Sequence, residues 1–253
     1  MATDLQKASI WKRIAAWLFD SILLGILAVA CGVLISFCLG YDAHSDTLES
    51  AYAQYEQQYG VTFEISLEEY EAMSQTQREN YDAAYGALVA DEEAMYAYNM
   101  MLSQTLVILT VAILLATAVM EWLIPLKLGN GMTLGKKIFG LALIRNDGVQ
   151  LNNMQLFTRT ILGKYTVETM IPVLIILMIY WGTMGVMGTL ILFALTLGQL
   201  ASMIFTRGNC AIHDLMAGTI VVDYASQTIF KTTEDLIAYQ KRMAAQRAAR
   251  APY

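Results

Sequence analysis

An arginine and an aspartate stand seven positions apart where the first apolar segment of the chain begins. Because each residue turns a helix by about 100°, Arg13, Ala16 and Asp20 fall on one helical face. The spacing places Asp20 ~10 Å deeper in a membrane than Arg13. Arg13 can keep its head among lipid phosphates, but a carboxylate at that depth is costly and should face the helix bundle, a partner or a water-filled cavity. The pattern predicts either a functional carboxylate or a purely structural hydrogen-bonding group.

Further polar residues lie in or near the apolar segments. Glu121 is expected in the same half of the membrane as Asp20, so the two carboxylates could line one polar cavity. A contact between an interfacial Glu121 and Lys127 explains Glu121 almost as well. His213 and Asp214 are adjacent and suggest a proton relay. Neighbouring residues point in different directions on a helix, however, and no Ser or Cys nucleophile stands at a readable spacing from them. We expect no catalytic residue and no enzyme activity.

A glycine-rich stretch at 129–137 has some features of a phosphate-binding loop but departs from its pattern. The position five before Gly135 is Asn130 rather than glycine, and Lys136 is followed by Lys137 rather than by Ser or Thr. A glycine-rich turn followed by a cationic surface fits these residues better. The three cysteines include no CxxC pair and no Cys/His cluster, so we expect no disulfide framework, no bound metal and no cofactor.

The elements that must hold these residues are apolar helices. Of the 253 residues, 57% are hydrophobic and 15% are charged, which is too apolar for the surface of a water-soluble domain. The blocks at 14–39 and 101–126 each reach the ~20 residues that cross a ~30 Å hydrocarbon core. The block at 166–205 is about twice as long as one crossing needs, so we divide it at 181–185. The sequence predicts an all-α, polytopic membrane bundle of four transmembrane helices.

Two regions of opposite charge orient these helices. The formal net charge is −6, but residues 41–99 hold thirteen acids against Arg78 alone, which gives that segment −12 and leaves +6 for the rest of the chain. Basic residues concentrate before the first helix, between the second and third, and after the fourth. Such residues favour the cytoplasmic side of a membrane. We therefore place both termini in the cytoplasm, the acidic segment outside, and the protein in the plasma membrane.

The acidic segment is predicted to be helical. Two capping-box spacings occur in it, Ser66 with Glu69 and Thr76 with Glu79, and the second of these helices could run straight into the membrane. Its acids either concentrate cations at the outer mouth of a pathway or simply form a solvated surface. The tail at 232–250 is expected to be a surface helix. The chain thus divides into the N-terminus with the first helix (1–40), the acidic insertion (41–99), the rest of the membrane domain (100–223) and a basic cytoplasmic tail (224–253).

Three motifs in order resemble those of the RDD family of membrane proteins, which is named for one arginine and two aspartates. The opening motif is Arg13-x-x-Ala16-x-x-x-Asp20. The central motif contains Gly131, Thr133, Gly135, Lys136 and Gly140, and the closing motif runs from His213-Asp214 to Gly218 and Thr219. By this resemblance Asp214 matches the second aspartate, and Arg159 occupies the place of the arginine that follows the central motif. The resemblance covers 10–223 apart from the insertion, which is larger than is usual in the family.

The resemblance implies a transport role, with cation/proton exchange suggested for some family members. We expect a transporter or transport-accessory module that uses an intramembrane carboxylate. The alternative is a non-catalytic assembly or scaffold protein that binds a partner through 41–99. Expected partners are the lipid bilayer, monovalent cations or protons, a protein at 41–99 and a second copy of the chain, but no nucleic acid. The candidate binding or transport residues are Arg13, Asp20, Glu121, Arg159, His213 and Asp214.

Overall fold

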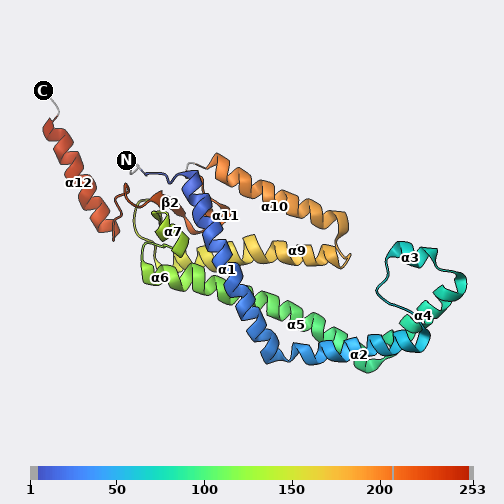
Figure 1. The fold of residues 1–253 in the computed structure, drawn as a ribbon. Coiled ribbons are helices and arrows are strands. Elements are labelled where there is room, and N and C mark those ends of the chain that lie inside the picture. The colour runs from blue at the N-terminus through green and yellow to red at the C-terminus, as the bar shows by residue number, and fades with distance from the viewer. Residues whose placement is uncertain (1–4, 207, 251–253) are drawn as a thin grey trace. The chain divides into compact units, whose positions relative to one another are not determined.

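The computed structural model of the chain describes residues 5–206 and 208–250 and is mainly helical (Figure 1). Two of its helical segments, η1 and η2, are π-helical, and two short strands form the sheet. The elements in chain order are α1 (Ile10–Leu39), α2 (Tyr41–Tyr59), α3 (Leu67–Ala72), α4 (Gln75–Ala90), α5 (Glu92–Thr117), η1 (Ala118–Leu123), α6 (Ile124–Leu128), α7 (Leu134–Ile138), β1 (Leu141–Arg145), α8 (Asn153–Phe157), η2 (Thr158–Met170), α9 (Ile171–Tyr180), α10 (Gly185–Phe205), α11 (Ile212–Ala217), β2 (Thr219–Asp223) and α12 (Thr233–Arg250).

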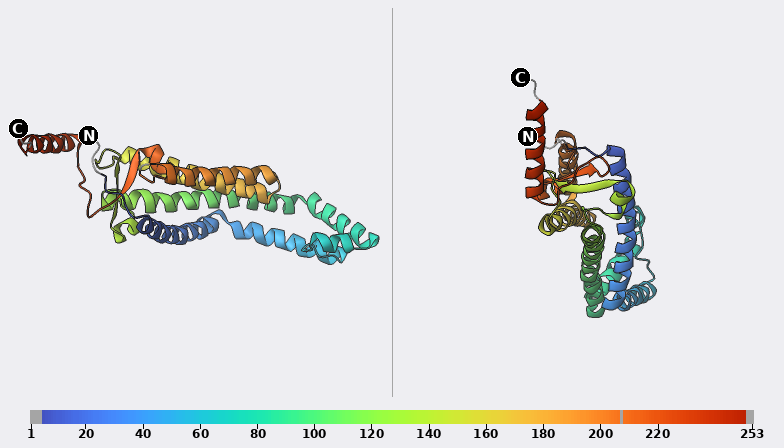
Figure 2. Two further views of the ribbon diagram at one scale, coloured as in Figure 1. Left: turned by 90° about the horizontal axis from the view of Figure 1, so that it is seen from above. Right: turned by 90° about the vertical axis from the view of Figure 1, so that its left-hand side faces the viewer.

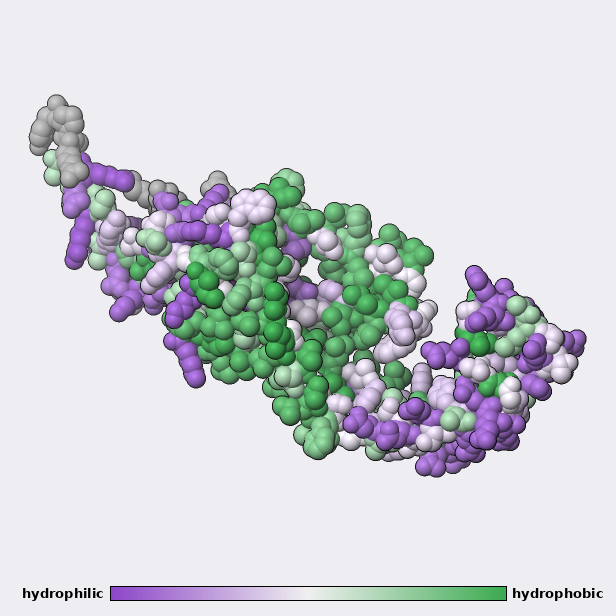
Figure 3. Space-filling view, in the orientation of Figure 1, coloured by the Kyte–Doolittle hydropathy of each residue, from purple (hydrophilic) through white to green (hydrophobic). Residues whose placement is uncertain are grey.

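Within residues 5–206 and 208–250, four helical stretches are long and apolar enough to cross a membrane, as predicted. They are Ile10–Leu39, Glu92–Leu128, Asn153–Tyr180 and Gly185–Phe205. The last two form the expected hairpin, in which α9 and α10 lie side by side (Figure 2) and are joined by a turn where Gly182 has a positive φ of 71°. Apolar side chains are exposed along the spans, as lipid contact requires. Figure 3 shows these hydrophobic residues gathered over α1, α9 and α10.

The described chain divides into two compact units, of which one is Val29–Ala112. In this unit α2 packs against α4, and small residues such as Ala84 and Ala97 are fully buried between helices. A chain of edge-to-face aromatic pairs links Tyr52, Phe63 and Tyr81. The insertion is therefore largely helical, as its sequence predicted, and has a small core of its own.

One of the two predicted capping boxes is correct and the other is wrong. Ser66 and Glu69 cap α3 as expected. The cap of α4 is Ser74 with Gln77, two residues before the predicted Thr76. Ser74 has the extended backbone that an N-cap needs, whereas Thr76 already lies inside the helix. The helix also ends at Ala90 instead of continuing into the membrane, because the next residue, Asp91, is extended and caps α5 through the amides of Glu93 and Ala94.

The other unit contains a feature that the sequence did not predict, a two-stranded antiparallel sheet. Leu141 pairs with Asp223 and Arg145 with Thr219. The first four residues of both strands are buried. One face packs on Met132 and Cys210, and the other on Leu156 and on Ala16 of α1. Because α7 directly precedes β1 and α11 directly precedes β2, the sheet brings these two short helices into the same region.

Glycines make the tight connections to this sheet. Gly140, between α7 and β1, and Gly218, between α11 and β2, both have φ near +65°, a left-handed conformation that suits glycine. Gly131 has a φ of 58°, and a Cβ there would lie 2.8 Å from the side chain of Leu143. These three glycines of the central and closing motifs are therefore explained by backbone conformation and close packing. Beyond the sheet, α12 forms the expected helix in the tail, with Leu236 buried near its start.

Candidate functional site

Asp20 of α1 lies against the start of α7. Its side chain is 6% exposed, and both carboxylate oxygens accept hydrogen bonds, one from the hydroxyl of Thr133 and the other from the amide of Gly135 at 2.8 Å. Thr133 also caps α7, because its Oγ1 accepts from the amide of Lys136. A Cβ on Gly135 would lie 2.5 Å from the carbonyl oxygen of Ala16. Asp20 therefore points neither into lipid nor into bulk solvent and fastens the first helix to α7.

Arg13 has different partners from Asp20, although both residues lie on one face of α1. Its NH1 donates to the carbonyl oxygen of Gly208 at 3.3 Å, and its NH2 lies 3.9 Å from Oδ2 of Asp214. Arg13 therefore anchors the start of α1 near α11, while Asp20 anchors it near α7. Sharing one helical face therefore does not give the two residues common partners.

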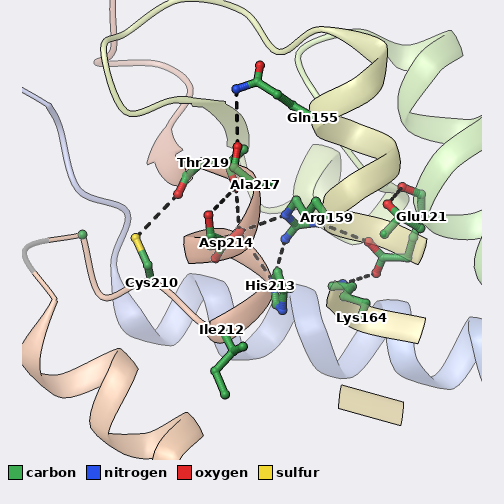
Figure 4. A network of polar contacts seen from close by, with 12 residues as sticks. Glu121, Gln155, Arg159, Lys164, Cys210, Ile212, His213, Asp214, Ala217 and Thr219 are labelled. Carbon is green, nitrogen blue, oxygen red and sulfur yellow. Dashed lines mark hydrogen bonds and ion pairs between the residues drawn. The ribbon is translucent and has the colours of Figure 1, made fainter. Parts of the chain in front are cut away.

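Arg159 of η2 is the centre of a buried ionic cluster (Figure 4). The residue is 2% exposed, and its guanidinium contacts three side chains on two other elements, η1 and α11. Its Nε donates to Oδ1 of Asp214 at 2.9 Å, its NH2 lies 2.9 Å from Nε2 of His213, and its NH1 lies 3.7 Å from Oε2 of Glu121. Thr219 donates to the same oxygen of Asp214 at 3.2 Å. One side chain thus connects the second span, the third span and the closing motif.

Glu121 and its partners come from the two π-helical segments. Its Oε1 forms an ion pair with the ammonium of Lys164, and its backbone oxygen accepts from the hydroxyl of Thr160 at 2.9 Å. A π-helical turn closes over five residues, so Arg159 and Lys164 face Glu121 from successive turns of η2. The predicted alternative partner of Glu121, Lys127, is wrong because Lys164 and Arg159 fill that role.

His213 and Asp214 are adjacent, yet both reach Arg159. Their helix, α11, lies very close to η2, since a Cβ on Gly163 would be 2.6 Å from Cβ of His213. Nδ1 of His213 lies 2.6 Å from Oε2 of Glu168, and its amide donates to Oε1 of Glu168 at 3.0 Å. If Nδ1 carries the proton, Nε2 is free to accept from Arg159. Neighbouring residues do point in different directions on a helix, but η2 lies so close to α11 that Arg159 reaches both His213 and Asp214.

Burial and neighbouring charges set the protonation of the groups outside the spans. Burial lowers the pKa of His213, which favours a neutral imidazole. Burial alone would raise the pKa of Asp214, but the charge and hydrogen bond of Arg159, with a smaller effect of Arg13, outweigh it and hold that pKa well below its usual range. Burial also lowers the pKa of Lys136 to about 8, against the opposing attraction of Glu121.

The cluster is balanced in formal charge. Four acids (Asp20, Glu121, Glu168 and Asp214) lie among four bases (Arg13, Lys136, Arg159 and Lys164). Of the six predicted site residues, Arg159 contacts three others directly, namely Glu121, His213 and Asp214. Arg13 reaches this group through Asp214. Asp20 lies apart from it and contacts α7. Asp20 and Glu121 have different hydrogen-bonding partners. The described residues include no group of His, Cys, Asp or Glu that could hold a metal ion.

Sequence reasoning gave no site role to Lys136, Lys164 or Glu168. Lys136 was predicted as a residue of the central motif and of a cationic surface, and the second expectation is wrong because Lys136 is buried. A signal for Lys164 was present, since a base five residues after Arg159 matches the spacing of a π-helical turn. Nothing local to Lys136 shows that it is buried while its neighbour Lys137 is exposed.

The family model that matches the chain is that of the RDD family, over residues 7–218. The chain belongs to the RDD family, and with its four apolar spans it is a multi-pass integral membrane protein. The matched region contains all six predicted site residues and the buried cluster. No curated protein and no solved structure matches the chain.

Proposed function

We propose that this RDD-family protein is a transporter, or a module of one, that exchanges monovalent cations and protons at an intramembrane carboxylate. The observation that best supports this is the state of Glu121. Its side chain is buried within the span Glu92–Leu128, and among the described residues its Oε2 has no hydrogen-bond partner. Ionisable groups inside spanning helices are costly, and an incompletely satisfied one marks an ion or proton pathway.

Exchange at Glu121 is a competition for one negative charge. Lys164 and Arg159 neutralise this carboxylate in the structure. A small cation that reaches the carboxylate would take over part of that neutralisation, and the proton for which it is exchanged would leave the cluster. Such exchange keeps the charges compensated, which matters because an uncompensated charge in a low-dielectric site is strongly unfavourable. The π-helical setting agrees with this proposal, since π-bulges are frequent at functional sites.

Asp20 has a positioning role in this proposal rather than an ion-carrying one. Both of its oxygens already accept hydrogen bonds, from Thr133 and Gly135. A cation at Asp20 would have to compete with two contacts that hold α7 in place. The carboxylate predicted from the sequence to carry the ion is therefore replaced by Glu121.

Proteoliposomes that contain the purified protein and an internal pH-sensitive dye test the assignment. A gradient of Na⁺ or K⁺ should move protons, and Glu121→Gln should slow this movement by about tenfold or more, which corresponds to ~1.4 kcal/mol or more in the barrier. The matched control is Glu79→Gln on exposed α4, which should leave the rate unchanged. If a folded Glu121→Gln protein moves protons at the wild-type rate, the carboxylate of Glu121 takes no part in the exchange.

The proposal includes a location in the plasma membrane with both termini in the cytoplasm. The basic segments beside the spans support it. In a variant without native cysteines, a cysteine at exposed Glu68 should react with an impermeant maleimide in intact cells. One at exposed Lys241 should react only after permeabilisation. Labelling of Lys241→Cys in intact cells would contradict this orientation.

The second candidate is an assembly protein that binds a partner through 41–99. It is favoured by the compactness of Val29–Ala112 as a unit and by a cavity there whose lining includes Glu49, Glu56 and Glu64. A partner with a basic surface would fit these acids. In this case the wild-type protein moves no ions, and replacing the three acids by glutamine in the full chain releases a stoichiometric partner from the complex isolated by crosslinking in the native membrane.

A further inference from the structure

Lys136 is a buried ammonium with few hydrogen bonds. The residue is 7% exposed, although it belongs to a short helix outside the four spans. Among the described residues, its Nζ has one hydrogen-bond acceptor, Oγ1 of Thr133 at 3.3 Å. An ammonium has three donors, and the proton of this hydroxyl is already directed at Asp20. The ammonium of Lys136 is therefore poorly solvated by the protein.

The charged groups that face Lys136 come from three other elements. They are Asp20 from α1, Glu121 from η1, and Arg159 and Lys164 from η2. These two acids and two bases cancel in formal charge, and the whole cluster is balanced when Lys136 is protonated. The cancellation also explains why burial decides the pKa of Lys136 and lowers it to about 8. The amine can therefore release its proton close to neutral pH.

We propose that Lys136 is the group that binds and releases the proton in this exchange, while Glu121 receives the cation. This inference rests on the proposed function. When the ammonium becomes an amine, one proton and one positive charge leave the cluster. A monovalent cation bound at Glu121 restores that charge, so the cluster has the same net charge before and after. Reprotonation of Lys136 expels the cation by like-charge repulsion. One proton is thus exchanged for one cation.

In this proposal the hydrogen bonds between Asp20 and α7 position Lys136. Thr133 connects Lys136 to Asp20, and the amide of Gly135 connects the same helix to Asp20. These hydrogen bonds fix the position of α7, and with it the distance of Nζ from Glu121. Asp20 is accordingly a positioning residue for the lysine.

The neighbouring lysine provides a matched control. Lys137 stands in the same helix and has the same charge, but it is exposed. Lys136→Arg and Lys137→Arg proteins are compared in the proteoliposome assay with Na⁺ and K⁺ gradients between pH 6.5 and 9. Arginine keeps the charge but does not release a proton in this range. We expect Lys136→Arg to lose at least about nine-tenths of the exchange, a factor of ten in rate, and Lys137→Arg to keep both the rate and its pH dependence.

A second measurement reports on Lys136 without transport. In detergent-solubilised protein labelled with ¹³C-lysine, the signal that disappears in the Lys136→Arg protein belongs to this residue, and its shift should titrate near pH 8. Size-exclusion profiles check that the variant is folded. Wild-type exchange that persists in Lys136→Arg, with unchanged pH dependence, overturns the role of Lys136 and leaves the proposed function standing. Absence of exchange in the wild type overturns both. A lysine signal that does not titrate below pH 10 overturns the role of Lys136 alone.

Discussion

Replacing Arg159 by methionine should destabilise the protein far more than replacing any surface arginine. The substitution keeps much of the apolar volume but removes a guanidinium that is 2% exposed. Asp214 and Glu121 then remain buried with fewer positive neighbours. Removal of one partner from a buried ion pair costs ~3–5 kcal/mol. At roughly 2–4 °C per kcal/mol for a chain of this size, the Tm should fall by on the order of 10 °C.

Thermal unfolding of the detergent-solubilised protein, followed by tryptophan fluorescence, measures this loss. The control is Arg145→Met, because Arg145 pairs with Asp147 on the surface, where both side chains are more than a third exposed. A surface pair contributes only ~0–1 kcal/mol. Arg159→Lys should give an intermediate loss, since an ammonium cannot reproduce the contacts that a guanidinium makes to three side chains.

A double-mutant cycle separates the ion pair from general damage to packing. Arg159→Met combined with Asp214→Leu removes both charges, so the double variant should lose less stability than the sum of the two single variants, with a coupling of ~0.5–3 kcal/mol. If the losses simply add, or if Arg159→Met melts like Arg145→Met, the guanidinium is not the centre of the cluster.

Three further predictions concern single positions. Gly135→Ala should lower the Tm, because a Cβ there would lie 2.5 Å from a backbone oxygen of α1. Gly86→Ala, in open space within α4, should instead raise stability by ~0.5–1 kcal/mol. Equal Tm values for the two variants would contradict the close approach at Gly135. Ser74→Ala should lower the free energy of unfolding by ~1 kcal/mol, and Thr76→Ala should hardly change it in the same assay. A larger loss in Thr76→Ala than in Ser74→Ala would show that Thr76 is the cap, as the sequence predicted. His213 has a lowered pKa, so the unfolded chain takes up a proton near pH 6.5 that the folded chain refuses, and stability should fall as the pH drops below ~6.5. His213→Gln should flatten that pH dependence, and an unchanged profile would assign it to another group.

The two strands show why part of the fold was not predictable. Leu141–Arg145 and Thr219–Asp223 are only five residues long and mostly apolar, and periodicity does not separate such runs from buried helix. Each strand is stabilised by the other, which is distant in the sequence. In contrast, the cap at Ser66 was predictable, because all of its groups lie within four residues.

The candidate site was predicted in its membership but not in its connections. Helical periodicity correctly placed Arg13 and Asp20 on one face, yet it carried no information on what that face meets. The meeting of Arg159 with His213 depends on Gly163, which lets α11 approach η2. The burial of Lys136 beside the exposed Lys137 depends on how α7 is held.

The sequence by itself determined that the described chain has four stretches able to cross a membrane, because the length of an uncharged block and the thickness of a bilayer are enough to decide that. Only the tertiary structure decided which base neutralises which acid. Attraction between charges depends on distances of a few ångströms, and those distances are set by a two-stranded sheet and two π-helical segments that bring 133–136, 159–168 and 213–214 to the same place.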